Sequence, residues 1–123
     1  MTVTRLDSHP PFVYFERSEF DCQETGENEI PDAFIHRLDE LRERCGFPFH
    51  VNSGYRSPKH SKEAAKNKPG EHTRAAADIR IPDGHRRYIL LREALAMGFT
   101  GIGVDDRFIH LDDRTTGPTV WTY

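Results

Sequence analysis

The sequence contains no apolar run approaching the roughly 20 residues that a membrane-spanning helix needs, so we expect no contact with a membrane. Residues 1–15 also lack the charged segment followed by an apolar segment that marks a secretory signal peptide. We therefore expect a protein made in the cytoplasm with no signal peptide.

Cysteine and blocks of like charge are also scarce. The two cysteines, Cys22 and Cys45, do not form a CxxC pair, and we expect two reduced thiols in or near the core. Lys+Arg 17 against Asp+Glu 20 gives a net charge of −3, and the charges are interspersed without a basic block. This pattern argues against nucleic acid as a partner.

What is present indicates one folded domain. The chain has 123 residues, of which 36% are hydrophobic and 30% charged, a balance typical of a globular protein. We find no repeat and no linker. We expect residues 1–29 to be an irregular lead-in packed on a domain formed by residues 30–123, and we expect a monomer.

Two segments have the period of a helix. The first is 31–45, which begins at Pro31 and is followed by Gly46, and the second is 84–97, which Asp83 can cap and Gly98 ends. Apolar residues recur at steps of 4, 3 and 4 in the first helix: Phe34, Leu38, Leu41 and Cys45. The apolar residues of the second include Tyr88, Leu91 and Leu95.

Other segments have the alternation of strands. The expected strands are 48–53, 75–81, 101–104 and 108–112, with a further short strand at 12–15. We expect a short polar helix over 59–66 and a loop over 67–70. Together these elements predict an α+β fold with a small antiparallel sheet and flanking helices.

Three residues supply the set of ligands that a catalytic zinc site needs, namely His72, Asp78 and His110. Alternate residues of a strand face opposite sides of the sheet. Because Ile79 and Ile109 are expected to face the core, Asp78 and His110 should point away from it. Taken singly, a residue of this kind is more often a solvated surface group, which is how we interpret His36, His50 and His85.

The context of these residues resembles a known family. Residues 53–60, SGYRSPKH, resemble the SGYRSxxHN signature of the zinc D-alanyl-D-alanine carboxypeptidases, a family that includes phage endolysins and resembles the fold of Hedgehog domains. Residues 71–79, EHTRAAADI, resemble its SxHxxGxAxD motif, and GFTGIGV at 98–104 with FIHLD at 108–112 resembles its closing segment. Trp121 also fits, and the likeness runs from about residue 30 to residue 123.

The resemblance implies a Zn²⁺-dependent peptidase that hydrolyses D-amino-acid peptides of bacterial peptidoglycan, as a D,D-carboxypeptidase or an endolysin-type endopeptidase. Its partner would be a peptidoglycan stem peptide, reached after release or export to the cell wall. Arg56 would grip a substrate carboxylate, or alternatively pin its turn. Ser53 and Tyr55 would line the substrate pocket, or simply pack.

Two positions depart from the family. The step from His72 to Asp78 is six rather than seven, and we place the missing residue at Arg74–Ala75, before the strand, so that Asp78 keeps its face. The usual positions of the general base hold Arg107 and Phe108.

The candidate substitutes for that base are Asp112, Asp106 and Asp105. Alternatively, Asp105 and Asp106 form a plain turn, and Asp112 orients a ligand histidine. Because the usual positions of the base lack an acidic residue or a histidine, a non-catalytic zinc-containing module that binds cell-wall peptide or a protein partner is an alternative function. A domain without metal is another.

Overall fold

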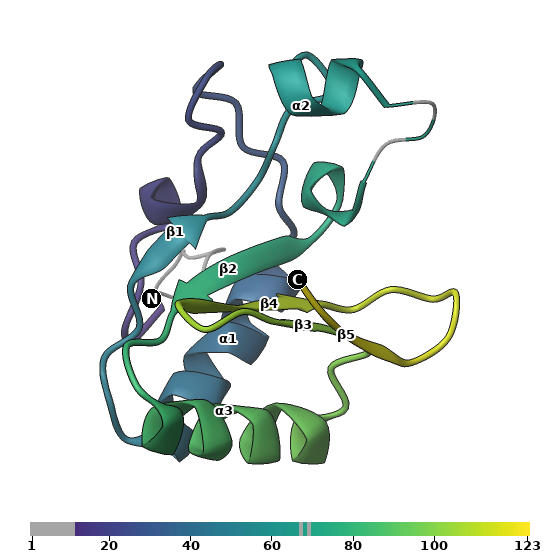
Figure 1. Ribbon diagram of the computed structural model, residues 1–123. Helices are drawn as coiled ribbons and strands as arrows, with labels where there is room; N and C mark the ends of the chain where they lie inside the picture. The colour runs from purple at the N-terminus through teal and green to yellow at the C-terminus, as the bar shows by residue number, and fades with distance from the viewer. Residues whose placement is uncertain (1–11, 67, 69) are drawn as a thin grey trace, which may run out of the picture.

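Helices and a sheet form two layers in the computed structural model, which describes residues 12–66, 68 and 70–123. Helices α1 (Asp32–Cys45) and α3 (Gly84–Met97) lie together on one side of a five-stranded sheet (Figure 1). The strands are β1 (Val51–Ser53), β2 (Ala76–Arg80), β3 (Gly101–Val104), β4 (Phe108–Asp112) and β5 (Thr119–Thr122). The predicted α+β class is confirmed.

The sheet has the order β1-β2-β4-β3-β5. All neighbouring strands are antiparallel except β3 and β5, which are parallel. Asp78 on β2 lies directly opposite His110 on β4, and Gly103 on β3 lies opposite the same histidine. The edge strand β5 was not predicted.

Helix α1 confirms its predicted face and end. Phe34, Leu38, Leu41 and Cys45 are all buried. Gly46 follows in the left-handed conformation, with φ of 77°, which a glycine adopts without steric cost.

Helix α3 begins and ends as predicted but buries a different face. The Asp83 carboxylate accepts a hydrogen bond from the Arg86 amide at its start. Leu90 and Ala94 are the buried residues, whereas Tyr88 and Leu95 are 63% and 58% exposed.

The strands separate an apolar face from a polar one. Ala77 and Ile79 of β2 and Ile109 and Leu111 of β4 are buried in the core. Because successive side chains alternate across a sheet, Asp78 lies on the opposite face. The prediction of which β2 side chains face the core is confirmed. The opposite face of the sheet is therefore available for polar groups.

The segment before α1 contains no strand among its described residues, so the strand predicted at 12–15 is wrong. The amides of Val13 and Tyr14 donate hydrogen bonds to the Asp39 carboxylate of α1, at 2.7 and 2.8 Å, rather than to a neighbouring strand. A 3₁₀ helix, η2 (Arg17–Phe20), follows, and Phe15 and Phe20 are buried in the core.

Several smaller predictions are corrected in extent. The strand expected over 48–53 is limited to β1, and the helix expected over 59–66 is the single turn α2 (Ser61–Ala64). In the loop predicted at 67–70, residues 67 and 69 lie outside the described residues. Both cysteines are free and buried, as expected. No helix in the described part of the chain is long and apolar enough to span a bilayer.

Candidate metal centre

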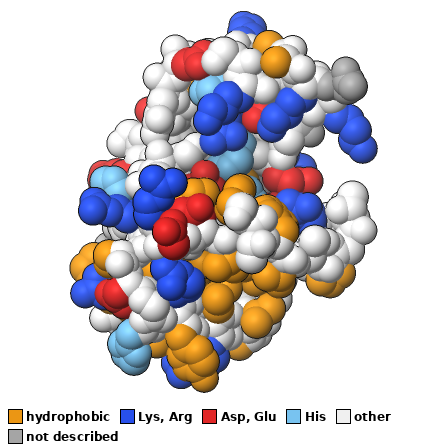
Figure 2. Space-filling view, in the orientation of Figure 1, with side chains coloured by type: hydrophobic (Ala, Val, Ile, Leu, Met, Phe, Trp, Pro, Cys, Tyr) orange, Lys and Arg blue, Asp and Glu red, His pale blue; other side chains and the backbone are white. Residues whose placement is uncertain are grey.

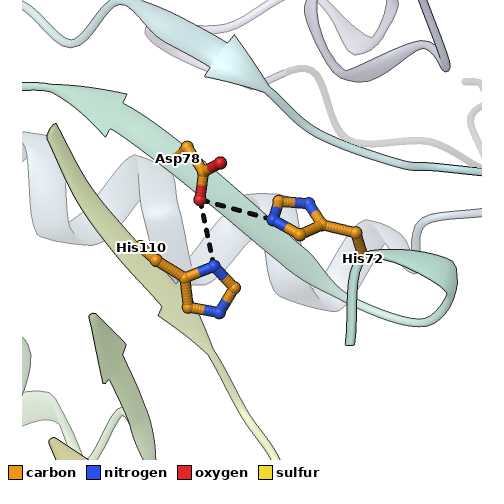
Figure 3. A group of neighbouring side chains, drawn as sticks. All are labelled: His72, Asp78 and His110. Carbon is orange, nitrogen blue, oxygen red and sulfur yellow. Dashed lines mark hydrogen bonds and ion pairs between the residues drawn. The ribbon is translucent and has the colours of Figure 1, made fainter. Parts of the chain in front are cut away.

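Three side chains from separate elements meet on the polar face of the sheet (Figure 3). His72 comes from the 3₁₀ helix η3 (Glu71–Thr73), Asp78 from β2 and His110 from β4. Asp78 Oδ1 lies 3.3 Å from His72 Nε2 and 3.0 Å from His110 Nδ1. One nitrogen or oxygen of each residue therefore lies within 4.8 Å of the others.

A turn at Arg74 and Ala75 connects η3 to β2. Helix η3 ends at Thr73, and Arg74 follows with φ of −119° and ψ of −77° before β2 begins at Ala76. Since the strand itself is uninterrupted, Asp78 keeps its place opposite His110.

The peptide carbonyl of Gly54 determines the tautomer of His72. His72 Nδ1 lies 2.7 Å from Gly54 O, and because a carbonyl only accepts, Nδ1 carries the proton. Nε2 of His72 then faces Asp78 Oδ1. Gly54 can take this position only as glycine, because a Cβ there would lie 2.6 Å from the Phe20 Cα.

Asp112 orients the second histidine. His110 Nε2 donates to Asp112 Oδ2 at 2.7 Å, which leaves Nδ1 facing Asp78. Asp112 is fully buried and also accepts three hydrogen bonds from Arg114, from its amide, Nε and a terminal nitrogen. The Arg114 guanidinium lies over the Trp121 ring, 4.6 Å from its centroid.

The charges of this cluster shift the pKa values in opposite directions. Burial alone would raise the pKa of Asp78, but the hydrogen bonds and charges of His110 and His72 outweigh it and hold that pKa well below its usual value. Burial alone would lower the pKa of His110, but Asp112 and Asp78 raise it overall. Burial alone would also raise the pKa of Asp112, but its hydrogen bonds with His110 and Arg114 outweigh burial and lower that pKa.

The geometry of the cluster fits a bound cation. Gly54 O and Asp112 each hold one nitrogen of a ring, so His72 Nε2 and His110 Nδ1 both face the Asp78 carboxylate, where a proton or a metal ion can lie between them. Separations of 3.0 and 3.3 Å are close to the edge of a tetrahedron with zinc–ligand bonds of about 2.0–2.1 Å, which is about 3.3 Å. Two imidazoles and one carboxylate are also a donor set of catalytic zinc sites. The residues therefore fit a divalent ion such as zinc.

The three groups open into a cavity of about 480 Å³. Figure 2 shows histidine side chains in a hollow that has Lys and Arg side chains above it and acidic and hydrophobic side chains along its lower edge. The basic residues that line this cavity are Arg56, Lys62, Lys66 and Arg114. Its carboxylates are those of Asp78 and Glu71. Lys66 and Arg114 already pair with Glu63 and Asp112, so Arg56 and Lys62 supply most of the positive charge that would suit an anionic ligand.

Arg56 presents unused hydrogen-bond donors to the cavity. Its side chain is only 18% exposed, and its nearest carboxylate, Glu63, lies 3.6 Å away. Within the described part of the chain, the guanidinium makes no hydrogen bond, while the backbone amide of Arg56 donates to His72 O at 2.8 Å. Glu63 is itself engaged by the Gly70 amide and the Lys66 ammonium, at 2.8 and 3.0 Å.

The other two predicted substrate-binding residues lie beside this cavity rather than in it. Ser53 and Tyr55 line a neighbouring cavity of about 220 Å³, which they share with Arg56. Tyr55 is 5% exposed and belongs to the core, so its placement favours the packing role.

None of the three predicted general bases lines the cavity. Asp105 accepts hydrogen bonds from the amide and Nε of Arg107, at 3.0 and 3.4 Å, and the Arg107 amide lowers its pKa. Asp106 has a side chain that is 88% exposed and also faces Arg107. These placements favour the plain turn for Asp105 and Asp106, and the burial of Asp112 behind His110 favours the orienting role.

Glu71 is a cavity carboxylate that the sequence reasoning missed. It directly precedes His72, and Arg74 holds it with hydrogen bonds of 2.6 and 3.1 Å. Its side chain is 29% exposed and therefore within reach of water. The one available signal was an acidic residue next to a candidate ligand.

Residues 13–112 match the family model described as Peptidase M15. The match includes all three residues of the cluster, and it confirms the resemblance drawn from the motifs. No curated protein matches the chain.

Proposed function

The chain belongs to the Peptidase M15 family, and on this basis we propose that it is a zinc-dependent peptidase that hydrolyses D-amino-acid-containing peptides of bacterial peptidoglycan. The reaction would be that of a D,D-carboxypeptidase or an endolysin-type endopeptidase. The observation that carries the proposal is the convergence of His72 Nε2 and His110 Nδ1 on Asp78 Oδ1, with the second nitrogen of each ring already bound elsewhere.

In this proposal His72, Asp78 and His110 hold the zinc ion. When bound, zinc acts as a Lewis acid that polarises the peptide carbonyl and makes water a stronger nucleophile. Gly54 O and Asp112 keep the two imidazoles in the tautomers that binding requires.

Arg56 fixes the substrate. A guanidinium forms two parallel charge-assisted hydrogen bonds with a carboxylate. That of Arg56 lines the cavity and, among the described residues, makes only the long 3.6 Å ion pair with Glu63. Binding a carboxylate there presents the peptide in a single register beside the metal ligands. Lys62 lines the same cavity and adds positive charge there.

Glu71 is our candidate for the proton transfer, because it is the cavity carboxylate left once Asp78 is assigned to the metal. It would accept a proton from the attacking water at its carboxylate and deliver it to the leaving amine. Glu71→Gln should then lower kcat by about 10²-fold or more while zinc content stays unchanged. Loss of zinc in this variant, or an unchanged kcat, would remove Glu71 from this role.

The test of the function combines metal analysis with product analysis. Protein loaded with one equivalent of zinc is incubated with purified peptidoglycan and with a peptide ending in D-Ala-D-Ala, and the products are identified by mass spectrometry. Release of free D-alanine indicates a carboxypeptidase, and cleavage within longer fragments indicates an endopeptidase. His110→Ala should lose zinc and activity together, whereas His85→Ala, which changes an exposed histidine of α3, should keep both.

One observation favours the alternative of a non-catalytic zinc module that binds cell-wall peptide or a protein partner. The positions at which relatives carry a general base hold Arg107 and Phe108, and Asp105, Asp106 and Asp112 lie outside the cavity. Stoichiometric zinc without hydrolysis of either substrate would establish this alternative.

A further inference from the structure

A second cavity continues the polar face of the sheet beyond the metal centre. It has a volume of about 540 Å³ and includes Asn52, Arg80, Arg107 and Phe108 in its lining. Phe108 lines the metal cavity as well, so the two hollows share one wall.

The strand register gives the distance between the second cavity and the metal centre. Arg80 pairs with Phe108 in the same ladder in which Asp78 pairs with His110, so each pair lies two residues from the other on the same face. Two residues of a strand span about 6.6 Å. An extended peptide covers a similar length with two of its own residues.

Arg56 and Arg80 lie on opposite sides of the metal centre. Strand β1 is antiparallel to β2, and beyond its end the Arg56 amide bonds to His72 O, on the side where β2 begins. The Arg80 amide bonds to His50 O, on the side where β2 ends. A peptide whose carboxylate is held by Arg56 would therefore extend toward Arg80 with the residues that precede the scissile bond.

The charged residues that line the second cavity are Arg80, Arg107 and Asp106. Arg107 is already paired with Asp105 and Asp106, at 3.4 and 3.6 Å. Arg80 is exposed, and among the described residues no carboxylate pairs with it. Its guanidinium can therefore bind an incoming carboxylate, while Pro82 and Phe108, which also line the cavity, can contact the aliphatic part of the residue that carries this carboxylate.

We propose that this cavity is a substrate subsite in which Arg80 binds a carboxylate-bearing residue about two positions before the scissile bond. The proposal rests on the peptidase function proposed above. It narrows the substrate class to peptides that are anionic on the N-terminal side of the cleaved bond as well as at the carboxylate held by Arg56.

The test compares two peptides of equal length that differ only in that residue, which carries either a carboxylate or a carboxamide. We measure kcat/KM with the zinc-loaded protein. We also measure the Kd of the matching product peptides, which are not cleaved, by calorimetry. Wild type should favour the carboxylate about fivefold in both quantities, the upper range for an exposed ion pair.

Arg80→Gln should abolish this preference, because its uncharged amide does not distinguish a carboxylate from a carboxamide. Arg92→Gln, at an exposed arginine of α3 outside both cavities, should keep it. The proposal is overturned if wild type does not discriminate, or if Arg80→Gln discriminates as wild type does. A preference in Kd without any hydrolysis would support the subsite and refute the peptidase function. Hydrolysis without a preference for the carboxylate would support the peptidase function and refute the subsite.

Discussion

Replacing Asp112 with asparagine separates the two roles that this residue could have. The substitution keeps the shape of a fully buried side chain but removes the charge that accepts hydrogen bonds from His110 Nε2 and from Arg114. If Asp112 orients His110 and raises the basicity of its ring, the affinity for zinc should fall about 10- to 100-fold, as for other partners of metal-bound histidines. This fall corresponds to about 1.4–2.7 kcal/mol.

The same change should also lower the free energy of unfolding. Arg114 would keep its charge beside a neutral amide, and breaking a buried ion pair on one side costs about 3–5 kcal/mol. The Arg114 side chain is 21% exposed, so water can solvate part of it and we expect the lower end of this range.

Zinc affinity is measured by competition with a chromophoric chelator, and stability by urea denaturation of the same samples. Asp113→Asn is the matched control, because this neighbouring carboxylate pairs with Arg74 at 2.8 Å rather than with the histidine. The control should bind zinc as wild type does. Unchanged zinc affinity in Asp112→Asn refutes the orienting role, and if kcat collapses at the same time, Asp112 is instead the general base.

Three further predictions test the packing, the metal and the thiols. Gly101→Ala should weaken zinc binding although it removes no polar group, because a Cβ there would lie 1.9 Å from Asp112 Oδ1; chelator competition equal to wild type would contradict this. We compare protein at a free zinc concentration 1,000 times Kd with the same protein after a chelator has removed the metal. Removal should lower the free energy of unfolding by about 4 kcal/mol and Tm by about 10 °C or more, as followed by scanning fluorimetry. His110→Ala should lose this response, and a wild-type Tm indifferent to chelator would argue against a metal site. Burial raises the pKa of Cys45 from 9.0 to about 11, so the folded state holds the protonated thiol and loses this contribution to stability as the pH rises from 9 toward 11. At pH 8 its alkylation, followed by mass spectrometry, should be about 100-fold slower than in urea, and equal rates would contradict the burial.

The local periodicity of the sequence was enough to predict most of the elements. Steps of three and four residues predicted α1, and glycines predicted the ends of both long helices. Strict alternation predicted which side chains of β2 and β4 face the core, and so directed Asp78 and His110 to the opposite face. These features depend on neighbours within a few residues of one another, which a sequence displays directly.

Elements with few residues or without alternation were harder to predict. Strand β5 pairs in parallel with β3 at the edge of the sheet, and Val120 in it is 57% exposed, so no apolar pattern marks it. The residues at 12–15 have a strand-like composition, but Asp39 satisfies the amides of Val13 and Tyr14. A distant side chain decided that conformation.

The sequence by itself determined which residues could hold a metal, since His72, Asp78 and His110 stand in recognisable motifs and on predictable faces. Only the tertiary structure decided where the other charged residues of the site lie and which role each can have. It placed Glu71 in the cavity, Asp112 behind His110, and Arg80 at the far side of the metal centre from Arg56. The physical reason is that the role of a carboxylate or a guanidinium follows from the groups within about 3 Å of it. Those groups come from other strands and turns, whose approach no local pattern records.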